Sequence, residues 1–276
     1  MPVLQRDSAR IYYEDIGCGE PIIAIHGLAQ NSSFWSISGL SPSLACKYRF
    51  ISMDMRAHGR TAVADDSKGF NVETVVDDIE ALADFLGFEH FHLLGHSTGG
   101  MAAVHLAMRS NDRLISLMLM DTSSATTLIA GNEQARIRFM ERFAASFEDN
   151  SWDDIIAYTR KYPHPLFNGL DKQKDSEKIW RAVEIIMKQN DRISVGAFVR
   201  SFYTDPDPKI AALRQIKCPT LVLLGKLDKL MLEPSEIMAR EIPGARHVLL
   251  EGVGHMSAIE APERTLETIL NFLETL

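Results

Sequence analysis

Residues 91–100 read FHLLGHSTGG, an apolar run that stops at Gly95 and continues into the pattern G-x-S-x-G, with Ser97 at its centre. The run has the length and composition of a buried strand, and residues 102–108 have those of a helix. A serine between such elements lies on a sharp turn, where its backbone is strained and free helix N–H groups point towards it. The stretch therefore predicts a nucleophilic serine at position 97; the alternative is a glycine-rich turn with an incidental serine.

The same alternation of short apolar runs and helical patterns extends on both sides of this turn. Runs that are apolar on both faces are typical of strands buried under helices on either side, and strand–helix alternation predicts a mostly parallel sheet. Residues 11–14 are expected to form part of a hairpin. The other predicted strands are 21–25, 48–53, 91–94, 114–120, 220–224 and 247–250.

The pattern changes after Asp121. From about 122 to 208 the sequence has almost no strand signal and contains amphipathic helices, one of which opens with a capping-box pattern at Ser151 and Asp154. The sequence therefore predicts one α/β core, residues 1–121 and 209–276, interrupted by a helical insertion at 122–208.

Composition excludes several functional classes. The 276 residues are 46% hydrophobic and 24% charged, which is typical of a globular protein. The net charge of -8 argues against nucleic acid and anionic membranes as partners, because both require a basic surface. We find no apolar run of about 18 residues and no secretory signal. The three cysteines lie far apart and predict neither a disulfide framework nor a metal site, so we expect a reducing, cytoplasmic setting.

A nucleophilic serine needs a base and an acid. Of the nine histidines, His255 is the best candidate base, because it follows the last predicted strand on a glycine-rich loop. The acid that holds the histidine in its tautomer is expected at Asp228, just beyond the strand 220–224, with Asp121 as the rival at another strand end. Along the chain these residues occur in the order Ser97, Asp228, His255, which is the nucleophile–acid–base order expected when the serine lies on this type of turn.

An oxyanion hole needs two N–H donors aimed at one point. The backbone of Thr98, the residue after the nucleophile, is expected to supply one. The other is expected from Leu28, in the loop after the strand 21–25, where Gly27 allows a close approach of the backbone.

Taken together, these motifs resemble the α/β-hydrolase superfamily over essentially the whole chain. The matching segments are His26-Gly27, residues 54–61, residues 95–100, residues 225–228 and Gly254-His255. The resemblance implies an α/β-hydrolase fold with a helical cap at 122–208 and a Ser-Asp-His triad. It also implies that residues 54–61 are mainly structural, and we interpret Asp54 and Arg56 as a buried ion pair that braces the loops.

The serine at the sharp turn, Ser97, distinguishes the chain from dehalogenases and epoxide hydrolases of this fold, which carry aspartate at that position. C–C bond hydrolases of ring-cleavage diketones are similar in size and lid, but their oxyanion loop tends to be richer in glycine and a tryptophan often follows the histidine, where this chain has Met256. The default expectation is hydrolysis of a carboxylic ester or lactone. The alternatives are a C–C bond hydrolase and a slow or non-catalytic ligand receptor.

We expect no cofactor and no metal, a small-molecule ester or lactone as the partner, and a monomer or homodimer. An apolar pocket is expected to bind the substrate. Its predicted lining residues are Phe34, Trp35, Met231, Met256 and the lid residue Trp180, with Trp152, Phe167 and Phe198 as further candidates.

Overall fold

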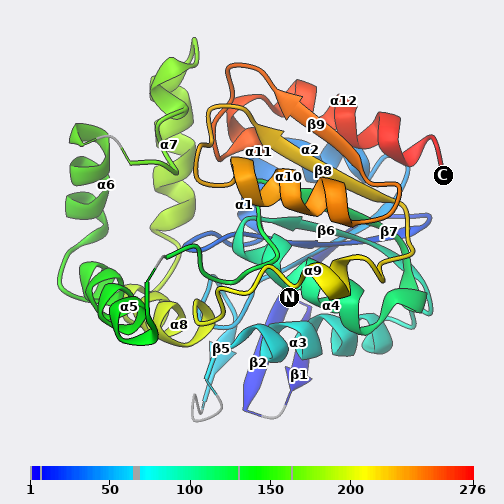
Figure 1. The fold of residues 1–276 in the computed structure, drawn as a ribbon, viewed down its shortest axis with the longest axis horizontal. Coiled ribbons are helices and arrows are strands. Elements are labelled where there is room, and N and C mark those ends of the chain that lie inside the picture. Colours follow the sequence, from blue (N-terminus) through cyan, green and yellow to red (C-terminus); the bar gives the residue numbers. More distant parts are fainter. Residues whose placement is uncertain (1, 7, 65–68, 130, 163) are drawn as a thin grey trace.

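The computed structural model describes residues 2–6, 8–64, 69–129, 131–162 and 164–276. In this part of the chain a nine-stranded sheet runs through the centre of the molecule in the order β1-β2-β4-β3-β6-β7-β8-β9, and β5 pairs with β2 (Figure 1). The strands are β1 (Val3–Arg6), β2 (Ala9–Gly17), β3 (Pro21–Ile25), β4 (Arg49–Met53), β5 (Ala62–Val63), β6 (Phe91–His96), β7 (Leu114–Met120), β8 (Thr220–Gly225) and β9 (Arg246–Leu250).

The sheet is mostly parallel, as the sequence predicts. β3 pairs in parallel with β4 and β6, and the parallel pairing continues through β7 and β8 to β9. β1 and β2 form the expected antiparallel hairpin, and β2 joins β4 antiparallel. Because the carboxyl ends of parallel strands meet at one edge, the residues after β3, β6, β7, β8 and β9 come close together there.

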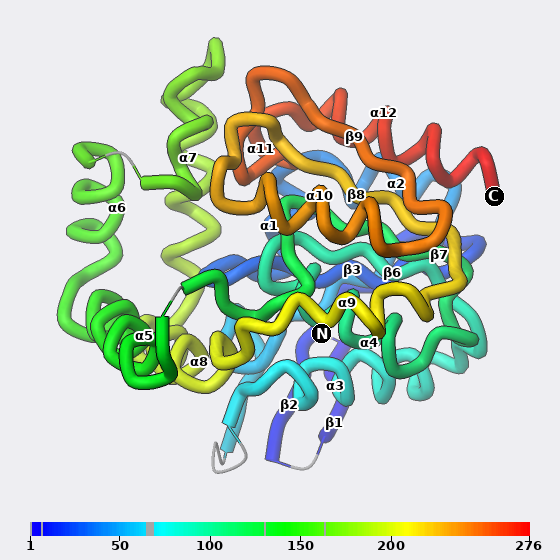
Figure 2. The backbone as a smooth tube through the Cα atoms, viewed as in Figure 1, coloured from blue at the N-terminus to red at the C-terminus, as the bar shows by residue number. Residues whose placement is uncertain are grey.

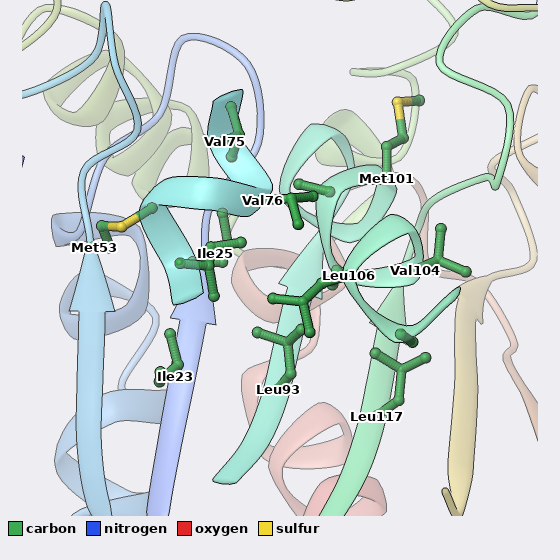
Figure 3. Packing of buried hydrophobic residues seen from close by; sticks show 14 of the residues in the cluster. Ile23, Ile25, Met53, Val75, Val76, Leu93, Met101, Val104, Leu106 and Leu117 are labelled. Carbon is green, nitrogen blue, oxygen red and sulfur yellow. The ribbon is translucent and has the colours of Figure 1, made fainter. Parts of the chain in front are cut away.

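Helices cover both faces of the sheet because its strands are apolar on both faces. Ile23 and Ile25 pack against the layer of α3 and α4 (Figure 3). Ile22 and Ala24 belong to the hydrophobic cluster on the opposite face. The first layer consists of α3 (Val72–Phe85), α4 (Thr98–Arg109), α9 (Ile210–Leu213) and α10 (Leu232–Glu241). The second consists of α1 (Ser33–Ile37), α2 (Leu40–Leu44), α11 (Ser257–Glu260) and α12 (Pro262–Leu273). A 3₁₀ turn, η1 (Asn111–Arg113), precedes β7.

Residues 122–208 lie between β7 and β8 and contain no strand among their described residues. Their helices gather at one side of the sheet, at the left of Figure 2. The Ser151 side chain accepts a hydrogen bond from the N–H of Asp154 and the Asp154 side chain accepts one from the N–H of Ser151, which confirms the capping box. The elements are α5 (Glu133–Glu148), α6 (Trp152–Lys161), the 3₁₀ turn η2 (Leu170–Lys172), α7 (Ser176–Met187) and α8 (Arg192–Phe202).

The expected ion pair between Asp54 and Arg56 is wrong. Asp54 accepts hydrogen bonds from the backbone N–H groups of Ser32 (2.6 Å) and Arg60 (2.8 Å), which compensate its buried charge. Arg56 instead forms a bidentate pair with Asp78 on α3, at 2.6 Å and 3.0 Å. The planar guanidinium fork matches the two oxygens of that carboxylate, and the pair ties the loop after β4 to α3.

We predict that Asp78→Asn lowers the free energy of unfolding by about 3–5 kcal/mol, because the buried Arg56 guanidinium loses its counter-charge. The matched control is Asp15→Asn, which breaks the bidentate pair of Asp15 with Arg49 at a partly exposed site. That variant is expected to lose about 1 kcal/mol or less. Urea unfolding of both variants checks the difference; equal losses would contradict a special role for the buried pair.

Candidate active site

Ser97 lies at the tip of the turn between β6 and α4, with backbone angles φ 52° and ψ −119°. The two glycines beside it are required by close backbone contacts. A Cβ atom on Gly95 would lie 2.5 Å from the Cα of Gly100, and one on Gly99 would lie 2.3 Å from the carbonyl oxygen of Ile25. The G-x-S-x-G pattern is therefore a steric requirement of this turn, and Ser97 itself takes a positive φ that is strained for a residue with a side chain.

The structure brings Ser97, His255 and Asp228 together. His255 Nε2 is 2.9 Å from Ser97 Oγ, and His255 Nδ1 is 2.6 Å from Asp228 Oδ2. The other carboxylate oxygen of Asp228 accepts hydrogen bonds from the N–H groups of Leu230 and Met231, both at 3.2 Å. The acid is thus fixed in place by its own loop, and it directs the Nε2 lone pair of the imidazole towards the serine.

Two opposing effects set the basicity of His255. Burial is the largest single effect and lowers the pKa of His255, but the negative charge of Asp228, its hydrogen bond and the charges of Asp121 and Glu260 together raise it by more. The net result is a pKa above the ordinary value of 6.5. The surroundings of His255 therefore favour its imidazolium form.

Asp121, the rival acid, is fully buried but bonds to other groups. Its Oδ1 accepts a hydrogen bond from the N–H of Gly225 (2.9 Å), and its Oδ2 accepts one from the hydroxyl of Ser257 (2.6 Å). Burial, followed by repulsion from Asp228, raises the pKa of Asp121 to about 7. Asp121 therefore braces the loops that carry Asp228 and His255, whereas Asp228 contacts the imidazole itself.

The two expected oxyanion donors lie near the serine. Neither the Leu28 N–H nor the Thr98 N–H has an acceptor among the residues that the structure describes. A Cβ atom on Gly27 would lie 3.1 Å from Ser97 Cβ, so the loop after β3 passes directly beside the nucleophile. His26 holds this loop: its Nδ1 lies 2.8 Å from the carbonyl oxygen of Gly27, and its Nε2 accepts the N–H of Met55 at 3.0 Å.

A cavity of about 390 Å³ adjoins Ser97 and His255. Of the expected lining residues, Phe34, Met231 and Met256 do line it. Trp35 and Trp180 do not, and both expectations are wrong. Trp35 is fully buried, with its ring edge-on to Phe34 at a centroid distance of 5.0 Å.

The Trp180 indole is removed from the cavity by a hydrogen bond and a stacking contact. Its Nε1 donates to Asp171 Oδ1 at 2.6 Å, and its ring stacks on Phe167 at 5.9 Å. Of the three further candidates, Phe167 lines the cavity. Trp152 and Phe198 do not line it and are buried elsewhere.

Sequence reasoning missed three residues near the reacting groups. Glu260 is buried and accepts hydrogen bonds from the N–H groups of Gly254 (2.5 Å) and Met256 (3.1 Å), which flank His255. Tyr203 lines the cavity, and its hydroxyl is 2.5 Å from Thr98 Oγ1. His164 also lines it. No spacing pattern predicts these roles: Tyr203 reaches Thr98 from a distant part of the chain, Glu260 bonds to backbone groups of its own loop, and His164 lies in an irregular segment.

No group of three or more His, Cys, Asp or Glu side chains in the described part of the chain is arranged to hold a metal ion. None of the helices in that part is both long enough and apolar enough to cross a membrane.

Comparisons with known proteins agree with this geometry. The family model for the alpha/beta hydrolase fold matches residues 20–262. The pimeloyl-(acyl-carrier protein) methyl ester esterase of Aeromonas hydrophila is 24% identical over 277 residues, covering 94% of this chain and 98% of that protein.

Two solved structures are similar in fold. A thermophilic esterase from Thermogutta terrifontis has a TM-score of 0.81 at 24% identity, covering 97% of this chain and 94% of that one. The enol-lactonase from Burkholderia xenovorans LB400 has a TM-score of 0.82 at 22% identity, covering 99% of this chain and 100% of that one. These similar proteins are hydrolases by name. The chain belongs to the α/β hydrolase fold family.

Proposed function

We propose that the protein is a serine hydrolase that cleaves a carboxylic ester or lactone through an acyl-enzyme, with Ser97 as nucleophile, His255 as base and Asp228 as acid. The observation that carries the proposal is the continuous hydrogen-bonded chain from Asp228 through His255 to Ser97, at 2.6 Å and 2.9 Å, beside a cavity of about 390 Å³. Distances of this size are those required for proton transfer between a nucleophile and its base.

In the first half of the proposed reaction, Ser97 Oγ attacks the carbonyl carbon while His255 Nε2 accepts its proton. The carbonyl oxygen becomes an oxyanion, which the N–H groups of Leu28 and Thr98 stabilise. His255 then gives the proton to the leaving alcohol oxygen, the bond to that oxygen breaks, and the acyl group remains on Ser97. In a lactone the released alcohol stays attached to the acyl group.

In the second half, His255 accepts a proton from water as the water oxygen attacks the acyl carbon. The same two N–H groups hold the second oxyanion. Its collapse breaks the bond to Ser97 Oγ, which recovers its proton from His255, and the carboxylic acid leaves. Every proton that His255 accepts is returned within the same half-reaction, so the chain's own residues are sufficient for the cycle.

We also propose that residues 122–208 form a cap domain over Ser97, with the core formed by residues 1–121 and 209–276. The cavity beside Ser97 supports this division, because α5, α6 and α7 each contribute lining residues, such as Phe143, Ile155 and Val183. The arrangement puts the substrate between the core and the cap.

Acyl-enzyme formation tests the proposed activity. Mixing with p-nitrophenyl butyrate is expected to release nitrophenolate continuously, and acid quenching during turnover is expected to trap a butyryl group on Ser97, detected by peptide mass spectrometry. A ligand receptor would release little nitrophenolate. A C–C bond hydrolase would act on ring-cleavage diketones while esters and lactones stayed intact, and that result would refute the proposal.

The pKa of His255 predicts the pH dependence. Only the neutral imidazole accepts the serine proton, so kcat/KM is expected to fall as the pH decreases through the pKa of His255. Because Asp228 raises that pKa above 6.5, the acidic limb should be centred above pH 6.5, with a plateau on its alkaline side. A pH profile of kcat/KM for an uncharged ester checks this; a limb centred well below pH 6.5 would contradict it.

A further inference from the structure

The wall of the cavity carries no carboxylate, ammonium or guanidinium group within the described part of the chain. Much of it is formed by apolar side chains of two cap helices, which are Phe139, Met140, Phe143 and Phe147 on α5 and Val183, Ile186 and Met187 on α7. Beyond the reacting groups themselves, the wall gives a charged substrate no opposite charge.

Several polar side-chain oxygens on the wall already take part in hydrogen bonds within the protein. Gln30 Oε1 accepts the N–H of Gly27 (2.8 Å), Thr159 donates its hydroxyl to the carbonyl of Ile155 (2.8 Å), and Tyr203 pairs with Thr98.

His164 is the remaining ionisable group on the wall besides His255. Its Nδ1 accepts the N–H of Leu166 at 3.2 Å. Burial, and then repulsion from a protonated His255, lower the pKa of His164 below its ordinary value, so it is neutral near pH 7.

Three arginines of the cap are held by other partners. Arg200 pairs with Glu141 and Glu148, and Arg160 pairs with Glu177. Arg192 donates to backbone carbonyls, including that of Phe147 at 2.8 Å. Moving any of these side chains into the cavity would break an existing interaction.

Building on the proposed function, we infer that the substrate is an uncharged ester or lactone with an extended apolar portion, and that the site rejects substrates bearing a carboxylate on that portion. Transfer of a carboxylate from water into this cavity removes its hydration without supplying an opposite charge, which is unfavourable. The apolar portion binds because its surface and the apolar wall of the cavity are both removed from water on binding.

The aromatic side chains of α5 indicate where that portion lies. Phe139, Phe143 and Phe147 are spaced one helical turn apart, with ring centroids 6.3 Å and 5.2 Å apart. Their exposure falls along the row, from 46% for Phe139 at the rim to 6% for Phe147. A chain laid along this row buries each added methylene, so kcat/KM is expected to rise about fourfold per methylene until the cavity is full.

The kinetic test compares p-nitrophenyl hexanoate and octanoate with mono-p-nitrophenyl esters of dicarboxylic acids of the same chain lengths, at pH 8. We expect kcat/KM to be at least about 100-fold higher for the neutral member of each pair. Equal values, or a preference for the carboxylate, would overturn the inference.

A matched pair of variants tests whether the absence of charge on the cavity wall causes the discrimination against carboxylates. Phe139→Arg adds a cation at the rim of the cavity, and Ile137→Arg adds one on the same helix, at a residue that is 48% exposed and does not line the cavity. Phe139→Arg is expected to reduce the discrimination against carboxylates at least tenfold, while Ile137→Arg leaves it unchanged. An equal effect of both variants would point to the overall charge of the protein instead and would count against the inference.

A binding measurement distinguishes a failure of this inference from a failure of the proposed reaction. Calorimetry with Ser97→Ala is expected to show methyl octanoate binding at least about 100-fold more tightly than monomethyl octanedioate, which carries a carboxylate at the far end of the chain, at pH 8. This result would support an uncharged apolar portion even if no ester were hydrolysed, in which case only the proposed function would fail. Equal or tighter binding of monomethyl octanedioate would overturn the substrate class, whatever the activity.

Discussion

Ser97→Ala is expected to reduce kcat for ester hydrolysis by about 10⁶-fold, because it removes the atom that attacks the carbonyl and leaves only transition-state binding by the rest of the site. The fold should persist, since alanine retains the Cβ atom and loses only a hydroxyl whose hydrogen-bond partner is the His255 imidazole. Steady-state kinetics measures the loss, and thermal unfolding followed by circular dichroism checks the fold.

Two results would argue against this role of Ser97. Retention of activity within about tenfold of the original protein would mean that another group attacks the substrate. A large drop in melting temperature would mean that the loss of activity reflects unfolding. His90→Ala serves as a control at an exposed histidine outside the site, and it is expected to leave both activity and melting temperature unchanged.

Asp228→Asn is expected to lower kcat by about 10⁴-fold. Asparagine keeps the shape but directs an amide towards His255 Nδ1, which favours the tautomer that has no lone pair for the serine proton. It also removes the charge that raises the pKa of His255, so burial dominates and the acidic limb of the pH profile should move to lower pH. Kinetics across pH 4.5 to 9 measures both effects.

Asp121→Asn is the matched comparison, since Asp121 is an equally buried carboxylate on the neighbouring strand end. It weakens the hydrogen bonds to Gly225 and Ser257 but leaves the contact between Asp228 and His255 intact. The expected loss of activity is therefore far smaller than that of Asp228→Asn. A reversal of the two effects would assign the acid to the strand β7 instead.

The fold was accessible from the sequence because its signals are local. The apolar runs at 21–25 and 91–94 are unbroken and end at glycine or polar residues, as central parallel strands must. The G-x-S-x-G pattern was decisive because a side chain at Gly95 or Gly99 would meet backbone atoms.

Other features depend on where a side chain points and which partner it meets in the folded protein, and sequence periodicity does not predict either. The apolar face of α7 predicts that Trp180 is buried, but not that a hydrogen bond to Asp171 turns the indole away from the cavity. Similarly, proximity in sequence favours Asp54 as the partner of Arg56, whereas the fold brings Asp78 on α3 to the guanidinium. Tyr203 acts through a contact with a distant segment, and Glu260 through bonds to backbone N–H groups of its own loop, and neither carries a motif of its own.

Covalent labelling with a fluorophosphonate, followed by peptide mass spectrometry, tests the central claim most directly. The reagent reacts with a serine only where a base activates it and an oxyanion hole accepts the new charge. We predict one adduct per chain, on Ser97, which is absent in Ser97→Ala and forms much more slowly in Asp228→Asn. Labelling of a different serine, or no labelling of a protein that still hydrolyses esters, would contradict the proposed nucleophile and the mechanism built on it.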